Sequence, residues 1–175
     1  LRRFFERLAM WGRFRQKFLD DQPVHMDAET IAQTVSSLAK NRIGALIVIK
    51  GHDPLDRHLN GGIKLNGLLS QPLLESIFDP HSTGHDGAVV IDGNRLVQFG
   101  CHLPLSTNAG RFGALGLRHT AALGLSERCD ALSIVVSEER GTISIARQEQ
   151  LRQINSAAAL RVELESFYAQ MAPKR

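Results

Sequence analysis

Polar side chains that could do chemistry gather at three places in this sequence, each beside an expected helix or strand. The first is the stretch HSTGHDGAVVIDG, residues 81–93, where His85, Asp86 and Gly87 run directly into an apolar strand. A carboxylate and an imidazole so close together can hold a divalent cation or orient a hydroxyl group. A glycine lets the backbone approach a ligand closely. An Asp-Gly turn before a strand is also common without any ligand, so this stretch alone leaves both interpretations open.

The second place is the stretch GALGLRHTAALG, residues 113–124. Here Gly116 to His119 are expected in the first turn of a helix, where free backbone N–H groups and the positive end of the helix dipole favour an anion. Arg118 adds a planar guanidinium that suits phosphate oxygens, and His119 adds another hydrogen-bond donor. The alternative is that Arg118 only pairs with a carboxylate at the surface.

The third place is Ser137-Glu138-Glu139, at the expected tip of a hairpin. Adjacent acids at a turn are usually just solvated, and the functional alternative is a metal site completed from another direction. A triphosphate bound through a cation needs backbone amides and an arginine for the phosphates, and carboxylates for the metal. The three places together therefore predict a single cleft for a nucleoside triphosphate.

Other common signatures are missing from the sequence. It contains no G-x-x-x-x-G-K-[ST] loop, no H-E-x-x-H and no G-x-S-x-G. Gly110, Gly113 and Gly116 recur every three residues, but they follow an expected loop and not a strand. This context argues against a dinucleotide-binding fingerprint.

The elements that must position these residues alternate between helix and strand. Periodicity and turn residues predict four helices, a polar loop over 51–67, and five strands that include two hairpins. The expected fold is α/β: a single domain with a mixed central β-sheet that contains hairpins and is flanked by helices on both faces. The helices are expected over 27–44, 70–79, 118–127 and 149–170, and the strands over 45–50, 88–92, 95–105, 131–137 and 142–147.

Local signals set the expected ends of the helices. Asp27 is a predicted N-cap, Gly44 a predicted helix stop, and Ser70 a plausible cap of the second helix. The last helix is expected to bury an apolar face made of Leu151, Ile154, Ala158, Val162 or Leu164, and Phe167.

Composition places the chain among soluble globular proteins. Its 175 residues are 43% hydrophobic and 22% charged, enough for one domain with a real core. Cys101 and Cys129 match no zinc or redox spacing and are expected to be buried free thiols of a cytoplasmic protein. The longest apolar run, ALIVI at 45–49, is too short to span a bilayer. Because the first residue is leucine and not methionine, an upstream membrane anchor stays open.

The basic charge is concentrated at the start of the chain. Residues 1–19 hold six basic residues and one acid, while the rest holds fifteen basic and seventeen acidic residues. This distribution argues against a folded face that binds nucleic acid. Residues 1–22 are expected to form a basic amphipathic helix ahead of a nucleotide-binding domain over 23–175. That helix would lie on an anionic membrane surface or join an upstream anchor, or else would dock on the core or on a second copy of the chain.

At these residues the sequence resembles the catalytic domain of diadenylate cyclases, the family that condenses two ATP molecules into the bacterial second messenger cyclic di-AMP and releases pyrophosphate. The resemblance covers roughly residues 27 to 165 in one order. The matching blocks are KNRIGALIVI, GIKLNGLLSQPLLESIF, HDGAVVID, CHLPLS, LGLRHTAALGLSE and ALSIVVSEERGTISIA. It implies a nucleotidyltransferase with one ATP per subunit, in which two subunits of a homodimer or larger homo-oligomer must face each other.

The resemblance also implies roles for individual residues. Catalysis falls on the Asp-Gly-Ala motif, with Asp86 near the attacking 3′-hydroxyl, and on Arg118 and His119 at the phosphates. The catalytic positions are Asp86, Gly87, Ala88, Arg118 and His119. The ATP contacts are His102 and Leu103 around the adenine, with Gly116, Leu117, Arg118, His119, Thr120 and Ser137. The ligands of Mg²⁺ or Mn²⁺ are His85, Asp86, Glu138 and Glu139.

Two residues depart from the family pattern. Members usually read Gly-Thr-Arg-His-Arg, where this chain has Leu117 in place of the threonine and Thr120 in place of the last arginine. Losing one charge-assisted phosphate contact typically costs about 1.5–3 kcal/mol, roughly one to two decades in binding or rate. The first hypothesis is thus an active, metal-dependent diadenylate cyclase, and the second a nucleotide-binding or regulatory module on the same scaffold that does not cyclise. The sequence leaves the preferred base open.

Overall fold

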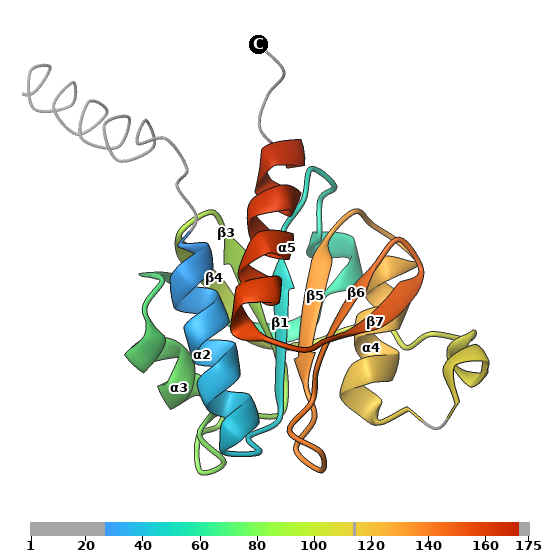
Figure 1. The fold of residues 1–175 in the computed structure, drawn as a ribbon. Coiled ribbons are helices and arrows are strands. Elements are labelled where there is room, and N and C mark those ends of the chain that lie inside the picture. The colour runs from blue at the N-terminus through green and yellow to red at the C-terminus, as the bar shows by residue number, and fades with distance from the viewer. Residues whose placement is uncertain (1–26, 114, 172–175) are drawn as a thin grey trace, which may run out of the picture.

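One seven-stranded sheet forms the centre of the molecule (Figure 1). The structure is a computed structural model that describes residues 27–113 and 115–171. In the sheet the strands lie in the order β2-β4-β3-β1-β5-β6-β7. The strands are β1 (Ala45–Ile49), β2 (Asn60–Leu68), β3 (Ala88–Asp92), β4 (Arg95–His102), β5 (Leu132–Val136), β6 (Ile143–Arg147) and β7 (Gln150–Ile154). The helices are α2 (Ala28–Lys40), α3 (Gln71–Phe78), α4 (Leu117–Ser126) and α5 (Ala157–Met171), with 3₁₀ turns at Asp56–His58 and Ala109–Phe112.

Strand direction brings distant parts of the chain together at one end of the inner strands. β1 pairs with β3 in parallel, Leu46 opposite Ala88, and with β5 in antiparallel, Ala45 opposite Val136. The starts of β1 and β3 therefore lie beside the end of β5. The turn before β3 and the turn after β5 are two of the three predicted polar places, so the topology alone brings them together.

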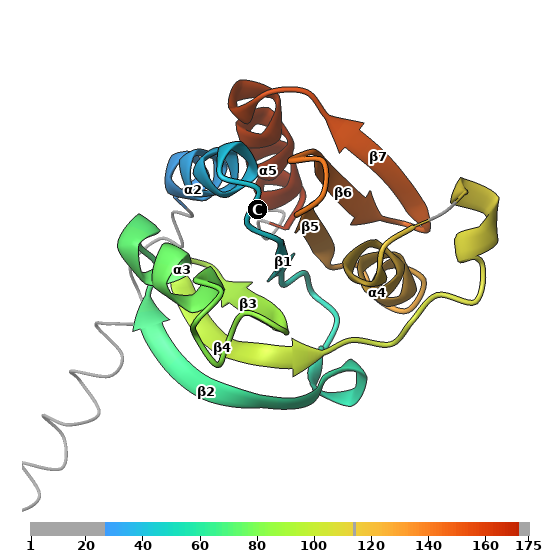
Figure 2. The same cartoon turned by 90° about the horizontal axis from the view of Figure 1, so that it is seen from below.

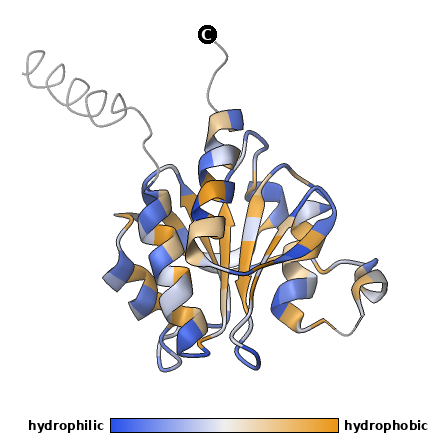
Figure 3. Cartoon of the chain, in the orientation of Figure 1, coloured by the Kyte–Doolittle hydropathy of each residue, from blue (hydrophilic) through white to orange (hydrophobic). Residues whose placement is uncertain are grey.

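Helices cover both faces of the sheet, as the sequence predicts (Figure 2). Residues of α2, α3 and α5 share one core cluster with Ile47 and Ile49 of β1, and residues of α4 share another with Leu46 and Val48. A strand buried on both faces is apolar throughout, which explains the run ALIVI. Hydropathy follows this layering, with hydrophobic central strands and hydrophilic outer helix faces (Figure 3).

The first described helix begins as predicted and ends earlier. Asp27 caps α2 by accepting a hydrogen bond from the Thr30 backbone N–H at 2.9 Å. The helix ends at Lys40, and Arg42 takes the left-handed conformation with a φ of 54°. Gly44 is therefore not the helix stop. Ser70 does hold the N-cap position of α3, although its side chain makes no capping hydrogen bond.

The predicted loop over 51–67 is wrong in its second half, because Asn60–Leu68 forms β2. This strand pairs with β4 and lies at the edge of the sheet. Nearly every residue of β2 is exposed, so no buried face imposes an alternating pattern on its glycine-rich sequence.

The predicted helix over 149–170 is wrong at its start. Residues Gln150–Ile154 form β7, which pairs with β6 across a two-residue turn at Gln148 and Glu149, with φ values of 51° and 60°. The helix α5 follows, and the Ser156 hydroxyl accepts a hydrogen bond from the Ala159 N–H at 3.1 Å. Its buried residues are Leu160, Leu164 and Phe167, whereas Val162 is 57% exposed and Ala158 is exposed.

Two further expectations concern the ends and the thiols of the chain. The predicted basic helix over 1–22 lies outside the described residues. None of the helices that the structure describes has both the length and the apolar character needed to cross a bilayer. Cys101 and Cys129 are buried free thiols, as predicted, and burial raises the pKa of Cys101 to about 11.

Candidate active site

The three predicted polar places line one pocket of about 580 Å³. His85 and Asp86 come from the turn before β3, Gly116 to His119 from the start of α4, and Ser137 to Glu139 from the turn after β5. The predicted convergence is confirmed. The volume lies within the usual range of ligand pockets, about 300–1,000 Å³.

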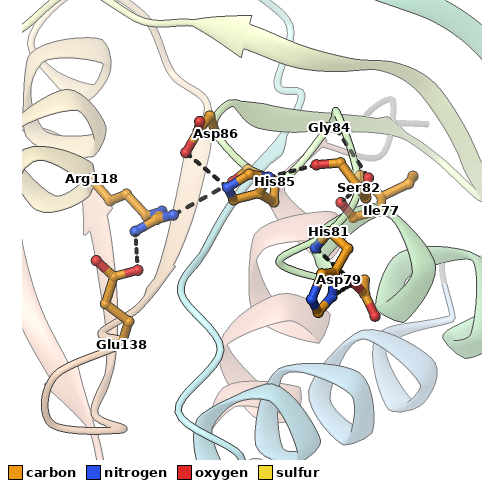
Figure 4. A network of polar contacts seen from close by, with 9 residues as sticks. All are labelled: Ile77, Asp79, His81, Ser82, Gly84, His85, Asp86, Arg118 and Glu138. Atoms are coloured by element: carbon orange, nitrogen blue, oxygen red, sulfur yellow. Dashed lines mark hydrogen bonds and ion pairs between the residues drawn. The ribbon is translucent and has the colours of Figure 1, made fainter.

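The His85 ring and the Asp86 carboxylate face each other at the pocket. The His85 Nδ1 lies 2.5 Å from the Ser82 carbonyl oxygen, which can only accept, so Nδ1 carries the proton. The other ring nitrogen, Nε2, lies 3.3 Å from the Asp86 Oδ1 (Figure 4). Two lone pairs would repel at this distance. Either a proton on Nε2 or a cation held by both groups removes that repulsion.

The other two residues of the Asp-Gly-Ala motif pack against the sheet. A Cβ atom at Gly87 would lie 2.4 Å from the backbone of Gly100 in β4, so only glycine fits. Gly100 itself has a φ of 69° beside an irregularity in the β3–β4 register. Ala88 is fully buried as the first residue of β3. Gly87 is needed because its backbone lies close to β4, whereas the sequence predicted a close approach to a ligand. Asp86 is the residue of the motif that borders the pocket.

The start of α4 presents backbone donors to the pocket. Gly116 holds the N-cap position and has no side chain to cap the helix. The imidazole of His119 lines the same space, and its pKa is lowered chiefly by burial and also by the charge of Arg140. A neutral imidazole beside free helix N–H groups can donate to an anion without adding charge of its own.

Arg118 bridges the three parts of the pocket. Its Nη1 donates to the Glu138 Oε2 at 2.8 Å, and its Nη2 lies 3.5 Å from the His85 carbonyl oxygen (Figure 4). The sequence left open whether Arg118 meets a phosphate or a carboxylate. In this structure it pairs with a carboxylate, and that carboxylate belongs to the predicted site.

Gly44 makes room for this ion pair. A Cβ atom there would lie 2.6 Å from the Arg118 Nη1 and 2.7 Å from the Glu138 Oε2. The residue just before β1 is thus a glycine because the two side chains cross the backbone there. The prediction that Gly44 ends the preceding helix is wrong for this reason too.

The turn after β5 holds its acidic residues outward. The Ser137 Oγ accepts a hydrogen bond from the Arg140 N–H at 3.3 Å, and the Ser137 carbonyl accepts one from the Gly141 N–H at 2.8 Å. Glu138 and Glu139 lie between these bonds and are exposed. The serine therefore shapes the turn that carries the two carboxylates.

Three predicted ATP contacts do not border the pocket. Thr120 donates its hydroxyl to the Gly116 carbonyl at 3.2 Å. His102 pairs with Asn60 at the end of β4, and Leu103 packs against the core beside α4. None of the three is among the lining residues that the structure describes.

The chain supplies only part of a metal site. Within residues 27–113 and 115–171 no three His, Cys, Asp or Glu side chains are placed to hold one ion. His85 and Asp86 fit as one pair of donors, while Glu138 is engaged by Arg118. Mg²⁺ in nucleotide sites usually takes one or two carboxylates and completes its shell with phosphates and waters, so this partial set fits an ion that arrives with a nucleotide.

Sequence reasoning missed two arginines of the pocket. Arg140 and Arg152 line it, from the turn after β5 and from β7. Arg140 directly follows the predicted acidic pair, and that adjacency was a usable signal. Arg152 was assigned to a helix, so the sequence offered no way to place it.

Comparison with known proteins decides the family. The family model described as DisA bacterial checkpoint controller nucleotide-binding, DAC, matches residues 32–151. The chain belongs to the DAC family. The chain is 38% identical over 170 residues to the cyclic di-AMP synthase CdaA of Bacillus subtilis, covering 96% of this chain and 62% of that protein. It is 40% identical over 154 residues to a diadenylate cyclase of Listeria monocytogenes, covering 86% of this chain and 56% of the relative.

A solved structure agrees with this assignment. A double mutant of DacA from Staphylococcus aureus matches this chain with a TM-score of 0.76 at 36% identity, covering 81% of this chain and 94% of that one. The fold is therefore that of the family. The chain spans about three fifths or less of the length of the two curated relatives above.

Proposed function

We propose that this DAC domain is a diadenylate cyclase, which condenses two ATP molecules into cyclic di-AMP and two pyrophosphates between facing subunits of a homo-oligomer. The observation that carries the proposal is the convergence of His85 and Asp86, the α4 start and the acidic turn on one pocket of a DAC-family chain. The relatives named as diadenylate cyclases support it.

The reaction forms one phosphodiester bond at a time. The 3′-oxygen of one ATP bonds to the α-phosphorus of the other, the bond from that phosphorus to the bridging oxygen breaks, and pyrophosphate leaves with the electron pair. Asp86, 80% exposed at the pocket, accepts the hydroxyl proton or orients the hydroxyl. The second bond forms in the same way and closes the ring.

The remaining residues bind and orient the triphosphate. The N–H groups at the start of α4, the Arg118 guanidinium and the neutral His119 donate to phosphate oxygens. A bound Mg²⁺ or Mn²⁺ would neutralise phosphate charge and lower the pKa of the attacking hydroxyl. His85 and Asp86 would hold it, joined by Glu138 or Glu139 from the acidic turn.

The test is direct. The purified protein is incubated with ATP and either Mn²⁺ or Mg²⁺ at several protein concentrations, and cyclic di-AMP is measured by mass spectrometry. Because two subunits must meet, the rate per mole of protein should rise with protein concentration until the dimer is saturated. Absence of the product at high protein concentration, with ATP bound, would reject the cyclase.

That outcome would leave the second candidate, a DAC domain that binds nucleotide without cyclising it. Two observations favour this candidate: Leu117 puts a 72% exposed apolar side chain at the helix start, and Thr120 bonds its own helix. The double change Leu117→Thr and Thr120→Arg restores the family pattern. Product from the double variant and none from the unchanged chain would establish the second candidate.

A further inference from the structure

Three arginine side chains line the pocket, and they differ in what they contact. Arg118 is paired with Glu138 at 2.8 Å, and Arg152 is paired with Glu163 of α5. Neither guanidinium can approach an anion fully without giving up its carboxylate. The Arg140 guanidinium makes no hydrogen bond or ion pair with any residue of the described part of the chain. It is the pocket arginine whose charge is not committed to another described residue.

The backbone that carries Arg140 is fixed. Its N–H donates to the Ser137 Oγ, and the next residue, Gly141, donates to the Ser137 carbonyl. Gly141 has a φ of 65°, and a Cβ atom there would lie 2.6 Å from the Ala39 carbonyl oxygen, so the turn packs against the end of α2. A fixed backbone under an exposed side chain limits where the guanidinium can reach. The guanidinium lines the pocket from this turn.

The surroundings of Arg140 suit a polyanion. Its charge reaches His119, whose pKa it lowers together with the larger contribution of burial. Arg140 lines the same pocket as the start of α4, where the helix N–H groups and the neutral imidazole can donate. Of the two acids preceding it in the turn, Glu138 is bound to Arg118. A planar guanidinium beside helix N–H groups is the arrangement that recognises phosphate oxygens.

We propose that Arg140 binds the triphosphate of ATP in this pocket and provides a phosphate-binding guanidinium that Thr120 does not supply. The proposal rests on the proposed function for its ligand. It assigns to the turn after β5 a phosphate-binding role in addition to its acidic residues. It also reduces the consequence of the departure at Thr120, since the turn after β5 offers the pocket a guanidinium of its own.

The experiment measures binding of α,β-methylene-ATP, which cannot be cyclised, by calorimetry with Mg²⁺. Arg140→Ala should weaken binding roughly 10–100-fold, the usual effect of losing a charge-assisted contact. Arg140→Lys keeps the positive charge but loses the paired N–H donors of the guanidinium, and it should weaken binding less than Arg140→Ala. Adenosine, which has no phosphates, should bind all variants alike. Arg140 is exposed on a turn, so thermal unfolding should confirm that each variant is folded.

The matched control is Arg152→Ala, which removes the same charge from the same pocket but from a side chain already paired with Glu163. It should weaken binding by less than about threefold. A loss of less than about threefold in Arg140→Ala, or an equal loss in Arg152→Ala, would overturn the proposal.

The same measurements separate this proposal from the proposed function. If the unchanged protein binds the analogue but makes no cyclic di-AMP from ATP, the cyclase proposal fails, and the binding of the variants still tests the role of Arg140. If the unchanged protein binds no analogue, both fall.

Discussion

Acidic residues cluster at both ends of the inner strands β1, β3 and β5, and the two clusters make different contacts. We call these two ends the two edges of the sheet. At the edge where β1 ends and β5 begins, the Asp130 carboxylate accepts the backbone N–H groups of His52 at 2.8 Å and Asp53 at 3.0 Å. The Asp53 carboxylate accepts the Asp130 N–H at 3.1 Å in return. At the pocket edge, Asp86 keeps 80% of its side chain exposed and its nearest described partner is a histidine 3.3 Å away.

The difference separates carboxylates bound to backbone N–H groups from a carboxylate that is open to solvent. Backbone N–H groups cannot leave, so Asp130 and Asp53 join two loops permanently. A Cβ atom at Gly51 would lie 2.2 Å from the Asp130 Oδ1, which shows how closely that contact is built. The side chains of the pocket contact one another or solvent, and such contacts can be exchanged for phosphates or a cation. We call the first region the Asp130 clasp.

The location of the pocket adds a second lesson. In open parallel α/β sheets, ligands bind beyond the carboxyl ends of the strands. Here the parallel pair β1 and β3 has its carboxyl ends near the Asp130 clasp, and the pocket lies at their amino ends. The sheet is mixed, so the end of antiparallel β5 and the start of α4 supply the pocket in its place.

The largest expected effect comes from Asp86→Asn. The change keeps the shape and removes the charge that the attacking hydroxyl or the metal needs, so cyclisation should fall roughly 10²–10⁴-fold. Binding of an ATP analogue without metal should stay close to that of the unchanged protein, because phosphates contact other groups. Mass spectrometry of the product and calorimetry of the analogue check the two halves. An equal loss of metal-free binding would remove Asp86 from its assigned role.

A change in the Asp130 clasp should give the opposite result. Asp130→Ala leaves two backbone N–H groups without their charged acceptor, and the free energy of unfolding should fall by about 1.5–3 kcal/mol. Cyclisation per folded molecule should not change. Urea unfolding and the product assay at low temperature measure both.

The matched control for the clasp is Lys50→Ala at the same edge. Lys50 pairs with Asp92 at 2.6 Å, but the two side chains are 38% and 50% exposed, so the loss of this pair should cost no more than about 1 kcal/mol. If Asp130→Ala costs as little as this control, or if it lowers activity as Asp86→Asn does, the comparison between the two edges is mistaken.

The pocket edge was more predictable from sequence than the elements that surround it. β1, β3 and β5 are apolar runs, and the polar residues beside them stood out for that reason. Edge strands lack this contrast. β2 is exposed along most of its length, and the turn into β7 places Gln148 and Glu149 at positive φ where such turns usually carry Asn or Gly.

The side-chain contacts of the site were beyond sequence reasoning. The convergence of the three places was predicted from the groups that a cation-bound triphosphate needs, but the pairing of Arg118 with Glu138 depends on their relative positions in space. The role of Gly44 depends on that pair in turn. A sequence shows that a glycine precedes a strand and cannot show which side chains cross above it.

The smallest expected effect tests this point with Gly44→Ala. The backbone at Gly44 is in an ordinary conformation, so the methyl group adds no strain of its own, and its nearest neighbours are the Arg118 guanidinium and the Glu138 Oε2. Both are ends of flexible side chains and can shift. Stability should change by less than about 1 kcal/mol, while binding of α,β-methylene-ATP should change by roughly two- to tenfold because Arg118 is displaced from its position in the pocket.

The matched glycine is Gly110, where a Cβ atom would meet nothing within 4 Å. Gly110→Ala should leave nucleotide binding and stability as they are, which separates displacement of the ion pair from the general effect of replacing a glycine. If Gly44→Ala binds the analogue like the Gly110→Ala control, the Arg118–Glu138 pair is not held in place by the backbone beneath it. The orientation of Arg118 would then depend on the turn after β5 alone. The side chains of the pocket could then shift more freely than their contacts indicate. The difference from the backbone-bound carboxylates of the Asp130 clasp would be larger still.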